Sequence, residues 1–236
     1  MTDKNSTYID WKTWNPQDFS KTSKIDEAYF NNIIKLLGLK KHSKILEIGF
    51  GNGSFMGYAR KNNYNCEGVE SNENLVDLAL QNNFEAYKTI GDINNKKKYD
   101  LMILLDVIEH VAENKIEGFF EDLSFYLEDN GSIFLRFPNG SSPLGLANQY
   151  GDVTHCSVIT LPKLNYWCSK SKLKVTYSRG DVMPFIFKHN YLKMPSRIVK
   201  LLLHKLTEKY LRLISTQSKG VLSSNLQVII KKHNES

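Results

Sequence analysis

The segment that decides the fold is Ile45-Leu46-Glu47-Ile48-Gly49-Phe50-Gly51-Asn52-Gly53-Ser54-Phe55. It reads as an apolar strand, a turn with three alternate glycines and the start of a helix. Glycines there let the backbone take steep conformations and let a ligand approach without a Cβ atom in the way. The spacing is not a dinucleotide fingerprint, because Ser54 stands in place of the third glycine, and the chain has no Gly-Lys-Ser/Thr phosphate loop. The acidic Glu47 beside the turn favours a cationic or amine-bearing ligand over a pyrophosphate.

Around this segment, short β-branched runs alternate with helical stripes, which is typical of βαβ units. The predicted strands are 44–48, 66–70, 85–89, 99–106, 132–137, 173–177 and 226–231. The predicted helices are 25–39, 54–62, 73–82, 115–127 and 161–169. We therefore expect an α/β fold with a doubly wound, mostly parallel sheet of seven strands.

Two stretches interrupt the alternation. Residues 138–160 follow the carboxyl end of a predicted strand, where open α/β sheets bind ligands, so they are expected to form a lid. Residues 183–224 contain a basic amphipathic helix before the last strand. Its apolar seam is Val199, Leu203, Leu206, Tyr210 and Leu213, with Arg197, Lys200, Lys205, Lys209 and Arg212 off the seam. The seam is expected to pack on the domain or on a second subunit, and the alternative is contact with a membrane or a lipid-linked substrate through 194–214.

Composition narrows the function classes. The 236 residues are 41% hydrophobic and 24% charged, which excludes disordered, collagen-like and coiled-coil proteins. The net charge of +6 comes from the C-terminal part, where Met183 to Ser236 hold ten Lys/Arg against two Asp/Glu. This asymmetry favours either an anionic partner or a solvated basic face. Three cysteines without metal-ligand spacing and apolar runs too short to cross a membrane predict a cytoplasmic protein, with the inner face of the membrane as an alternative location.

These segments resemble the class I S-adenosylmethionine-dependent methyltransferases, whose first motif is an acidic residue followed by Gly-x-Gly-x-Gly. The resemblance covers residues 25–180 and the last strand. It also rests on Glu70 and Gly91-Asp92 after the second and third strands, Asp106-Val107-Ile108-Glu109-His110-Val111 after the fourth, and Gly131-Ser132-Ile133 to Phe137-Pro138-Asn139 around the fifth. It implies S-adenosylmethionine as cofactor and S-adenosylhomocysteine as product. The cofactor-binding residues it implies are Glu47, Gly49, Gly51, Gly53, Glu70, Asp92 and Asp106.

The resemblance implies a single methyltransferase domain over residues 1–236. Its parts are a leader or cap at 1–24, a cofactor-binding core at 25–182, the basic helical insertion at 183–224, and the last strand and tail at 225–236. In the leader, Trp11, Trp14 and Phe19 either close over the ligands or fasten the N-terminus.

Within this family, Asp106-x-x-Glu109-His110 resembles the small-molecule O-methyltransferases of ubiquinone biosynthesis and of surface-polysaccharide genes. It differs from the Asn/Asp-Pro-Pro-aromatic motif of nucleic-acid and protein-glutamine N-methyltransferases, so no nucleic-acid partner is expected. The expected acceptor is a hydroxyl of a sugar or glycan precursor, with a quinone or phenol, or a non-catalytic scaffold, as alternatives. The polar lid residues that favour a sugar are Asn139, Ser141, Ser142, Asn148 and Gln149. The oligomeric state is left open.

A hydroxyl acceptor benefits from a base that takes its proton. His155 is the first candidate, oriented by Asp152, and anchoring of the lid is its alternative role. His110, at the turn after the fourth strand, is the other histidine expected near the reacting atoms. Some relatives bind a divalent ion through a Glu-x-x-Glu-His arrangement, but here Asp106 has a shorter reach, so a metal site is not favoured. Arg136 is expected either to meet an acceptor carboxylate or phosphate or to form an ion pair.

Overall fold

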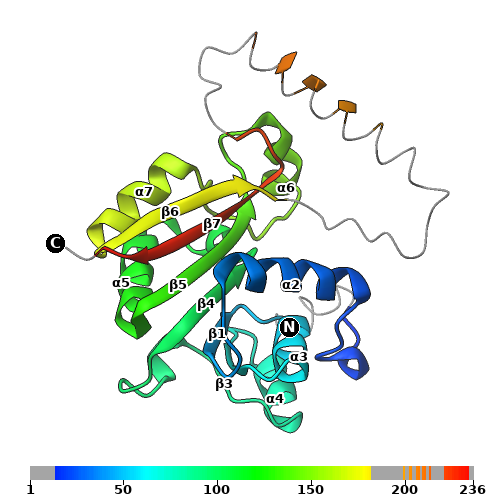
Figure 1. Ribbon diagram of the computed structural model, residues 1–236, viewed down its shortest axis with the longest axis vertical. Coiled ribbons are helices and arrows are strands. Elements are labelled where there is room, and N and C mark those ends of the chain that lie inside the picture. The colour runs from blue at the N-terminus through cyan, green and yellow to red at the C-terminus, as the bar shows by residue number, and fades with distance from the viewer. Residues whose placement is uncertain are drawn as a thin grey trace, which may run out of the picture.

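The computed structural model describes residues 14–181 and 221–233, and between them positions 199, 202, 203, 206, 207, 209, 210 and 213. Its strands form one seven-stranded sheet in the order β3-β2-β1-β4-β5-β7-β6 (Figure 1). The strands are β1 (Lys44–Ile48), β2 (Asn65–Val69), β3 (Ala86–Tyr87), β4 (Tyr99–Leu105), β5 (Leu127–Pro138), β6 (Leu173–Gly180) and β7 (Asn225–Lys232). Only β7 runs antiparallel to its neighbours β5 and β6. The predicted fold class is confirmed.

The helices begin and end where the sequence supplies capping groups. They are α2 (Lys24–Leu37), α3 (Ser54–Lys61), α4 (Glu73–Gln81), α5 (Ile116–Tyr126), α6 (Leu146–Tyr150) and α7 (Leu161–Lys170). At the start of α2, the Ser23 hydroxyl accepts a hydrogen bond from the Asp26 amide at 3.1 Å. The same helix ends at Gly38, whose φ of 61° is the left-handed conformation common after a helix. Local sequence therefore sets both limits of α2, a helix that borders the candidate site.

Helices cover both faces of the sheet, as Figure 1 shows. Successive side chains of β4 point to opposite faces. Met102 and Leu104 are in the core with α5 and α7, and Leu101 and Ile103 are in the core with α2 and α3. All four side chains are at most 1% exposed. This explains why β4 is apolar throughout, and it fixes the carboxyl end of β4 at the centre of the sheet.

Some predicted elements have different limits. The third strand is only Ala86–Tyr87, because Thr89 and Asp92 form the capping box of a 3₁₀ turn where the strand was expected to continue. The 138–160 segment is not an open loop, since it contains a 3₁₀ turn at Pro143–Gly145 and helix α6.

Several predictions fall outside the described residues. These concern Trp11 in the leader, and Arg197, Lys200, Lys205 and Arg212 of the insertion. The five seam residues are described, and each is helical and more than half exposed. The structure therefore does not have the predicted packing of this seam on the domain.

Candidate functional site

A cavity of about 540 Å³ lies at the carboxyl ends of β1, β2, β4 and β5. Open α/β sheets bind their ligands at this edge, where the strand order reverses. The predicted site residues that line the cavity are Glu47, Gly49, Gly51, Glu70, Asp106 and His110. The topology thus brings together predicted residues from three separate segments of the sequence, 47–51, 70 and 106–110.

The glycine turn forms the floor of this cavity. Gly49 and Gly51 have φ angles of 70° and 52°, which side chains rarely adopt. A Cβ atom on Gly49 would lie 2.6 Å from Cγ2 of Val107, and one on Gly51 would lie 2.6 Å from Cη2 of Trp14. Trp14 also lines the cavity, so the leader covers the turn. Both glycines are required by the close approach of neighbouring groups as well as by their backbone angles.

Glu70 is held in place by the loops around it. Its Oε2 accepts a hydrogen bond from the Gly51 amide at 3.1 Å, and its Oε1 accepts one from the Asn72 amide at 3.1 Å. The Ser71 hydroxyl donates to Oε1 at 3.2 Å. The carboxylate therefore joins the end of β2 to the glycine turn, and its oxygens retain lone pairs that can accept hydrogen bonds from a diol.

Glu47 is a buried carboxyl group beside the turn. The residue is 5% exposed, and its Oε2 has no hydrogen-bond partner among the residues that the structure describes. Burial raises the pKa of this carboxyl well above its usual range, and the nearby charge of Glu70 adds to the effect. A buried acceptor oxygen that lines a cavity suits a ligand ammonium group, which would restore the missing partner.

Asp92 and Asp106 are both predicted to bind the cofactor, but of the two only Asp106 lines the cavity. Asp92 is exposed, caps the Thr89 turn and is not among the residues lining the cavity. Asp106 lines the cavity, but its carboxylate is paired with Arg136, whose Nε donates to Oδ1 at 3.0 Å and whose Nη2 contacts Oδ2. The ion-pair alternative for Arg136 is therefore present in the structure.

A second cavity of about 540 Å³ adjoins the first. The two share Phe30, Asn52, Ser54, Leu105 and Arg136, and the second is further lined by Asp18, Lys21, Thr22, Ser23, Asp26 and Tyr29. The Tyr29 hydroxyl accepts a hydrogen bond from the Gln227 side chain at 3.0 Å, and burial raises the pKa of Tyr29 to about 12. The ring thus stays neutral and can donate its proton to a bound group. Nearly all the lining side chains of this cavity are polar.

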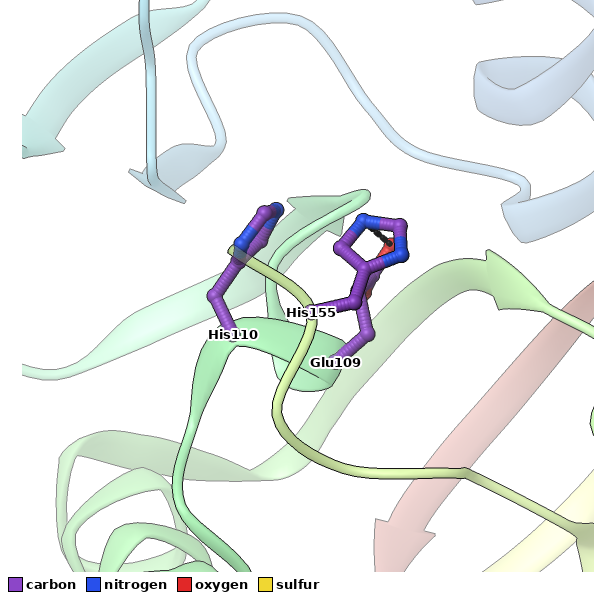
Figure 2. A group of neighbouring side chains, drawn as sticks. All are labelled: Glu109, His110 and His155. Atoms are coloured by element: carbon purple, nitrogen blue, oxygen red, sulfur yellow. Dashed lines mark ion pairs between the residues drawn. The ribbon is translucent and has the colours of Figure 1, made fainter. Parts of the chain in front are cut away.

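The two candidate histidines lie together, but at different depths (Figure 2). Their ring centres are 4.6 Å apart. His110 lines the first cavity, with its Nδ1 3.0 Å from the Thr154 hydroxyl and 3.3 Å from the Thr154 carbonyl. The His155 side chain is only 7% exposed and is not among the residues lining either cavity. Its Nδ1 is 2.9 Å from the Gln149 carbonyl, which can only accept, so Nδ1 carries a proton and Nε2 is the basic nitrogen.

Two carboxyl groups face Nε2 of His155. The distances are 3.7 Å to Oδ2 of Asp152 and 3.9 Å to Oε1 of Glu109. The Glu109 residue is fully buried, neither of its carboxyl oxygens has a hydrogen-bond partner, and burial raises the pKa of this carboxyl to about 8. Asp152 also accepts hydrogen bonds from the amide and hydroxyl of Thr154. Asp152 thus links the two histidines through Thr154.

One combination of these residues has the composition of a metal site. Ligand atoms of Glu109, His110 and His155 lie within 4.8 Å of one another. Two imidazoles with one carboxylate suit a transition metal such as Zn²⁺, and a carbonyl that holds the other nitrogen of His155 is the usual second contact of a metal-bound histidine. The set differs from the predicted one, because Asp106 is paired with Arg136 and His155 takes its place.

The polar lid residues were expected to face a sugar, but none of them lines the two large cavities. Asn139, Ser142 and Gln149 are at most 3% exposed. Their side chains stabilise the lid itself, for example through the hydrogen bond from Asn139 to the Val221 carbonyl at 2.7 Å. The short side chains of this stretch compete for local backbone groups, which explains their abundance there.

The sequence reasoning missed Tyr29 and Asn52 as residues of the site. Tyr29 lies among the buried residues of α2. A hydroxyl on the buried face of that helix is a signal, because a buried phenol oxygen needs a partner. Asn52 lies inside the glycine turn, where any side chain borders the ligand space.

Comparisons with known proteins agree with this geometry. A family model described as a methyltransferase domain matches residues 22–178. The ubiquinone biosynthesis O-methyltransferase of Rickettsia bellii (strain OSU 85-389) is 30% identical over 112 residues, which are 42% of this chain and 46% of the relative. The match thus spans less than half the length of that curated relative.

Solved structures share the fold over nearly the whole chain. A SAM-dependent methyltransferase from Archaeoglobus fulgidus has a TM-score of 0.63 at 16% identity, over 98% of this chain and 100% of that one. The plantazolicin methyltransferase BpumL in complex with SAH has a TM-score of 0.56 at 20% identity, over 98% of this chain and 90% of that one.

Proposed function

Because this chain belongs to the methyltransferase domain family, as its sequence predicts, we propose that it transfers a methyl group from S-adenosylmethionine to a hydroxyl of a small molecule. The acceptor we propose is a sugar or a glycan precursor of a surface polysaccharide. The observation that carries the proposal is the pair of adjoining cavities, one bordered by the glycine turn and acidic groups, the other by polar side chains.

The first cavity is the proposed cofactor site. When bound, S-adenosylmethionine supplies an activated methyl group on a positively charged sulfur. The Glu70 carboxylate would accept the ribose hydroxyls, and the unpartnered oxygen of Glu47 would accept the ammonium group. The glycine turn leaves the space these contacts need, and Trp14 would shield the bound molecule from water.

The second cavity is the proposed acceptor site. It offers hydroxyl, carboxyl, amide and guanidinium groups, and among its described lining residues Phe30 and Leu105 are the apolar ones. Such a lining can satisfy the many hydroxyl groups of a sugar, and it would leave the apolar tail of a quinone poorly covered. The lining of the second cavity therefore supports a sugar acceptor. The residues that support it are not the polar lid residues from which the sequence predicts a sugar.

His110 is the proposed general base, because of the two candidate histidines it is the one that borders the first cavity. With Nδ1 donating a hydrogen bond to the Thr154 carbonyl, Nε2 is the nitrogen that would take the acceptor proton. The bound cofactor would supply the methyl group and keep the electron pair of its carbon–sulfur bond, and His110 would take the proton that the acceptor hydroxyl gives up. His155 and Asp152 then act as positioning residues, which hold Thr154 and the base in place.

A quinone or phenol acceptor is the alternative. It is favoured by the name of the curated relative, a ubiquinone biosynthesis O-methyltransferase. We further propose the cytoplasm as the place of action, since Cys66, Cys156 and Cys168 are all unpaired, as is usual in a reducing compartment.

The test is an acceptor screen with methyl-labelled S-adenosylmethionine. The panel holds free sugars, nucleotide sugars, and phenols with two adjacent hydroxyls, and mass spectrometry follows S-adenosylhomocysteine and the labelled product. We expect turnover with the hydroxyl-rich sugars. Turnover with the phenols alone would replace the sugar by the alternative acceptor. Tight cofactor binding without turnover on any acceptor would favour a non-catalytic scaffold.

The second candidate function of the histidine cluster is to bind a divalent metal through Glu109, His110 and His155. It is favoured by the two oxygens of Glu109, which have no hydrogen-bond partner among the described residues. It would orient an acceptor oxygen near the cofactor site. Metal analysis of the purified protein and calorimetric titration with Zn²⁺, Mn²⁺ and Mg²⁺ test it directly. Binding that the Glu109→Gln variant loses would support the metal. Turnover unchanged by a chelator, on protein free of metal, would leave the histidines as base and positioning residue.

A further inference from the structure

Six large apolar side chains are exposed in one short stretch between β6 and β7. They are Val199, Leu202, Leu203, Leu206, Tyr210 and Leu213, and their exposed fractions run from 52% to 77%. Each lies in helical backbone. We call this set the 199–213 face. Ile25, Leu80 and Phe125 are also exposed, but they lie singly on separate helices and need no partner to explain them.

The spacing of the 199–213 face is that of one side of a helix. Starting from Val199, its members follow at intervals of three and four residues apart from the adjacent pair Leu202 and Leu203. At 3.6 residues per turn this spacing forms a continuous apolar stripe. A stripe of this kind in water is unfavourable, since each leucine that leaves water gains free energy roughly in proportion to its apolar area. The stripe therefore requires a binding partner that removes it from water.

The charge of this stretch indicates which kind of partner binds the apolar stripe. Residues 197–212 contain five Lys/Arg and a single acidic residue, Glu208. Among the described residues of the stretch, Lys209 is exposed. Two copies of such a segment would bring like charges together, whereas an anionic phospholipid surface supplies the opposite charge and an apolar layer below it. A helix with this mixture of basic and apolar residues is typical of one that lies flat on a membrane surface. No helix among the residues that the structure describes is long and apolar enough to cross a membrane.

We propose that the 199–213 face binds the surface of an anionic phospholipid bilayer. The leucines and Tyr210 enter the boundary between headgroups and acyl chains, while the surrounding lysines and arginines contact lipid phosphates. This contact does not depend on the acceptor or on methyl transfer. It would hold the enzyme at the membrane surface, where lipid-linked acceptors are concentrated.

The experiment is co-sedimentation of the full chain with vesicles of phosphatidylcholine alone and of an equimolar mixture with phosphatidylglycerol, at low and high salt. We expect sedimentation with the anionic vesicles only, and a decrease as salt rises, because salt screens the contacts to phosphate. The Leu203→Glu/Leu206→Glu variant should bind at least about tenfold more weakly, since two leucines lose their burial. Lys209→Gln should weaken binding by about fivefold.

Matched controls separate this contact from damage to the fold. Leu80→Glu places the same substitution on another helix at a leucine of 50% exposure, and it should bind vesicles like the unchanged protein. Lys174→Gln does the same for an exposed lysine of β6. Calorimetry with S-adenosylmethionine checks that each variant is folded. Equal sedimentation with neutral and anionic vesicles, or vesicle binding unaffected by Leu203→Glu/Leu206→Glu, would overturn the proposal. So would a dimer in sedimentation velocity that this variant dissociates, because the binding partner would then be a second copy.

Discussion

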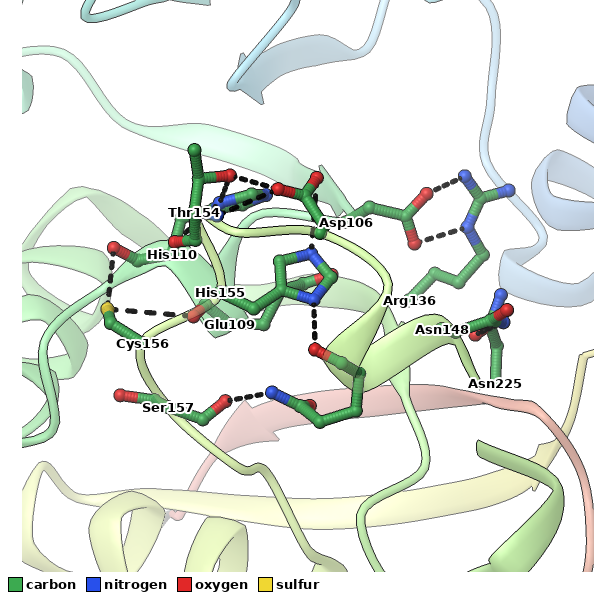
Figure 3. A network of polar contacts seen from close by, with 12 residues as sticks. Asp106, Glu109, His110, Arg136, Asn148, Thr154, His155, Cys156, Ser157 and Asn225 are labelled. Atoms are coloured by element: carbon green, nitrogen blue, oxygen red, sulfur yellow. Dashed lines mark hydrogen bonds and ion pairs between the residues drawn. The ribbon is translucent and has the colours of Figure 1, made fainter. Parts of the chain in front are cut away.

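The carboxylate of Asp106 accepts two hydrogen bonds from the guanidinium of Arg136 and so ties the end of β4 to the end of β5 (Figure 3). The two side chains are 41% and 24% exposed, and both border the first cavity. Asp106 has a φ of 58°, which aspartate and asparagine tolerate better than other side chains. The ion pair thus sets the wall between the proposed cofactor and acceptor spaces.

Asp106→Asn should lower the free energy of unfolding by about 1–3 kcal/mol, because Arg136 loses its charged partner while the backbone conformation is kept. Urea unfolding measures the change. Asp106→Asn/Arg136→Met should lose less than the sum of the single variants, since removal of both charges leaves neither unpaired. Strict additivity would show that the pair contributes nothing. Glu113→Gln breaks the exposed pair with Lys163 and should cost about 0–1 kcal/mol.

Gly51→Val should weaken S-adenosylmethionine binding by at least about tenfold, because the residue has a positive φ and its side chain would collide with Trp14. Calorimetric titration measures the affinity. Gly118→Ala is the matched control, since a Cβ atom there meets nothing within 4 Å and alanine favours the α5 helix. Glu70→Ala should also lose affinity, through the loss of the ribose contact. Normal affinity in Gly51→Val or Glu70→Ala would move the cofactor to another site.

Glu47→Gln should make the protein without cofactor more stable and bind the cofactor less tightly. The pKa of Glu47 is raised by burial, so its ionised form opposes folding at pH values above the unfolded-state pKa, and this penalty vanishes below about pH 4. The melting temperature should therefore rise at neutral pH and stay unchanged in acid. Loss of the contact to the ammonium group should weaken affinity by about 10–100-fold. A lower melting temperature at neutral pH would contradict this account.

His110→Ala should reduce kcat by about 10²–10⁴-fold with little change in cofactor affinity, as expected for loss of a general base. The step that the base produces in the pH profile of kcat should disappear with it. His155→Ala should reduce kcat less and keep that step, because His155 acts through Thr154 and His110. The opposite ranking of the two variants would make His155 the base, as the sequence first suggested. Both are measured on an acceptor found by the screen.

How far the sequence predicts this molecule depends on the range of the interactions involved. The strand, glycine turn and helix around Gly49 are local, so their pattern is visible in eleven consecutive residues. The limits of α2 follow from Ser23 and Gly38 for the same reason. Cofactor binding by Glu70 is what the family resemblance implies, and it stays a prediction; the structure places this carboxylate beside the glycine turn, where it accepts a hydrogen bond from Gly51.

The remaining features depend on contacts between distant segments. Arg136 pairs with Asp106 across thirty positions of sequence, and Tyr29 meets Gln227 across 198. The depth of His155 behind His110 is set by the path of the lid, which hydrogen bonds such as that from the Cys156 amide to the Glu109 carbonyl hold in place. No local pattern carries this information.

The antiparallel placement of β7 beside β6 has a consequence for how this chain can be altered. Gly180 pairs with Leu226, and the Asp181 amide donates to the Asn225 carbonyl at 3.0 Å, so the segment between them leaves and re-enters the sheet at one point. The cost of closing a loop grows slowly with its length, by about 0.6 kcal/mol for each doubling. The segment between β6 and β7 can therefore be exchanged or lengthened at little cost to the pairing of the two strands.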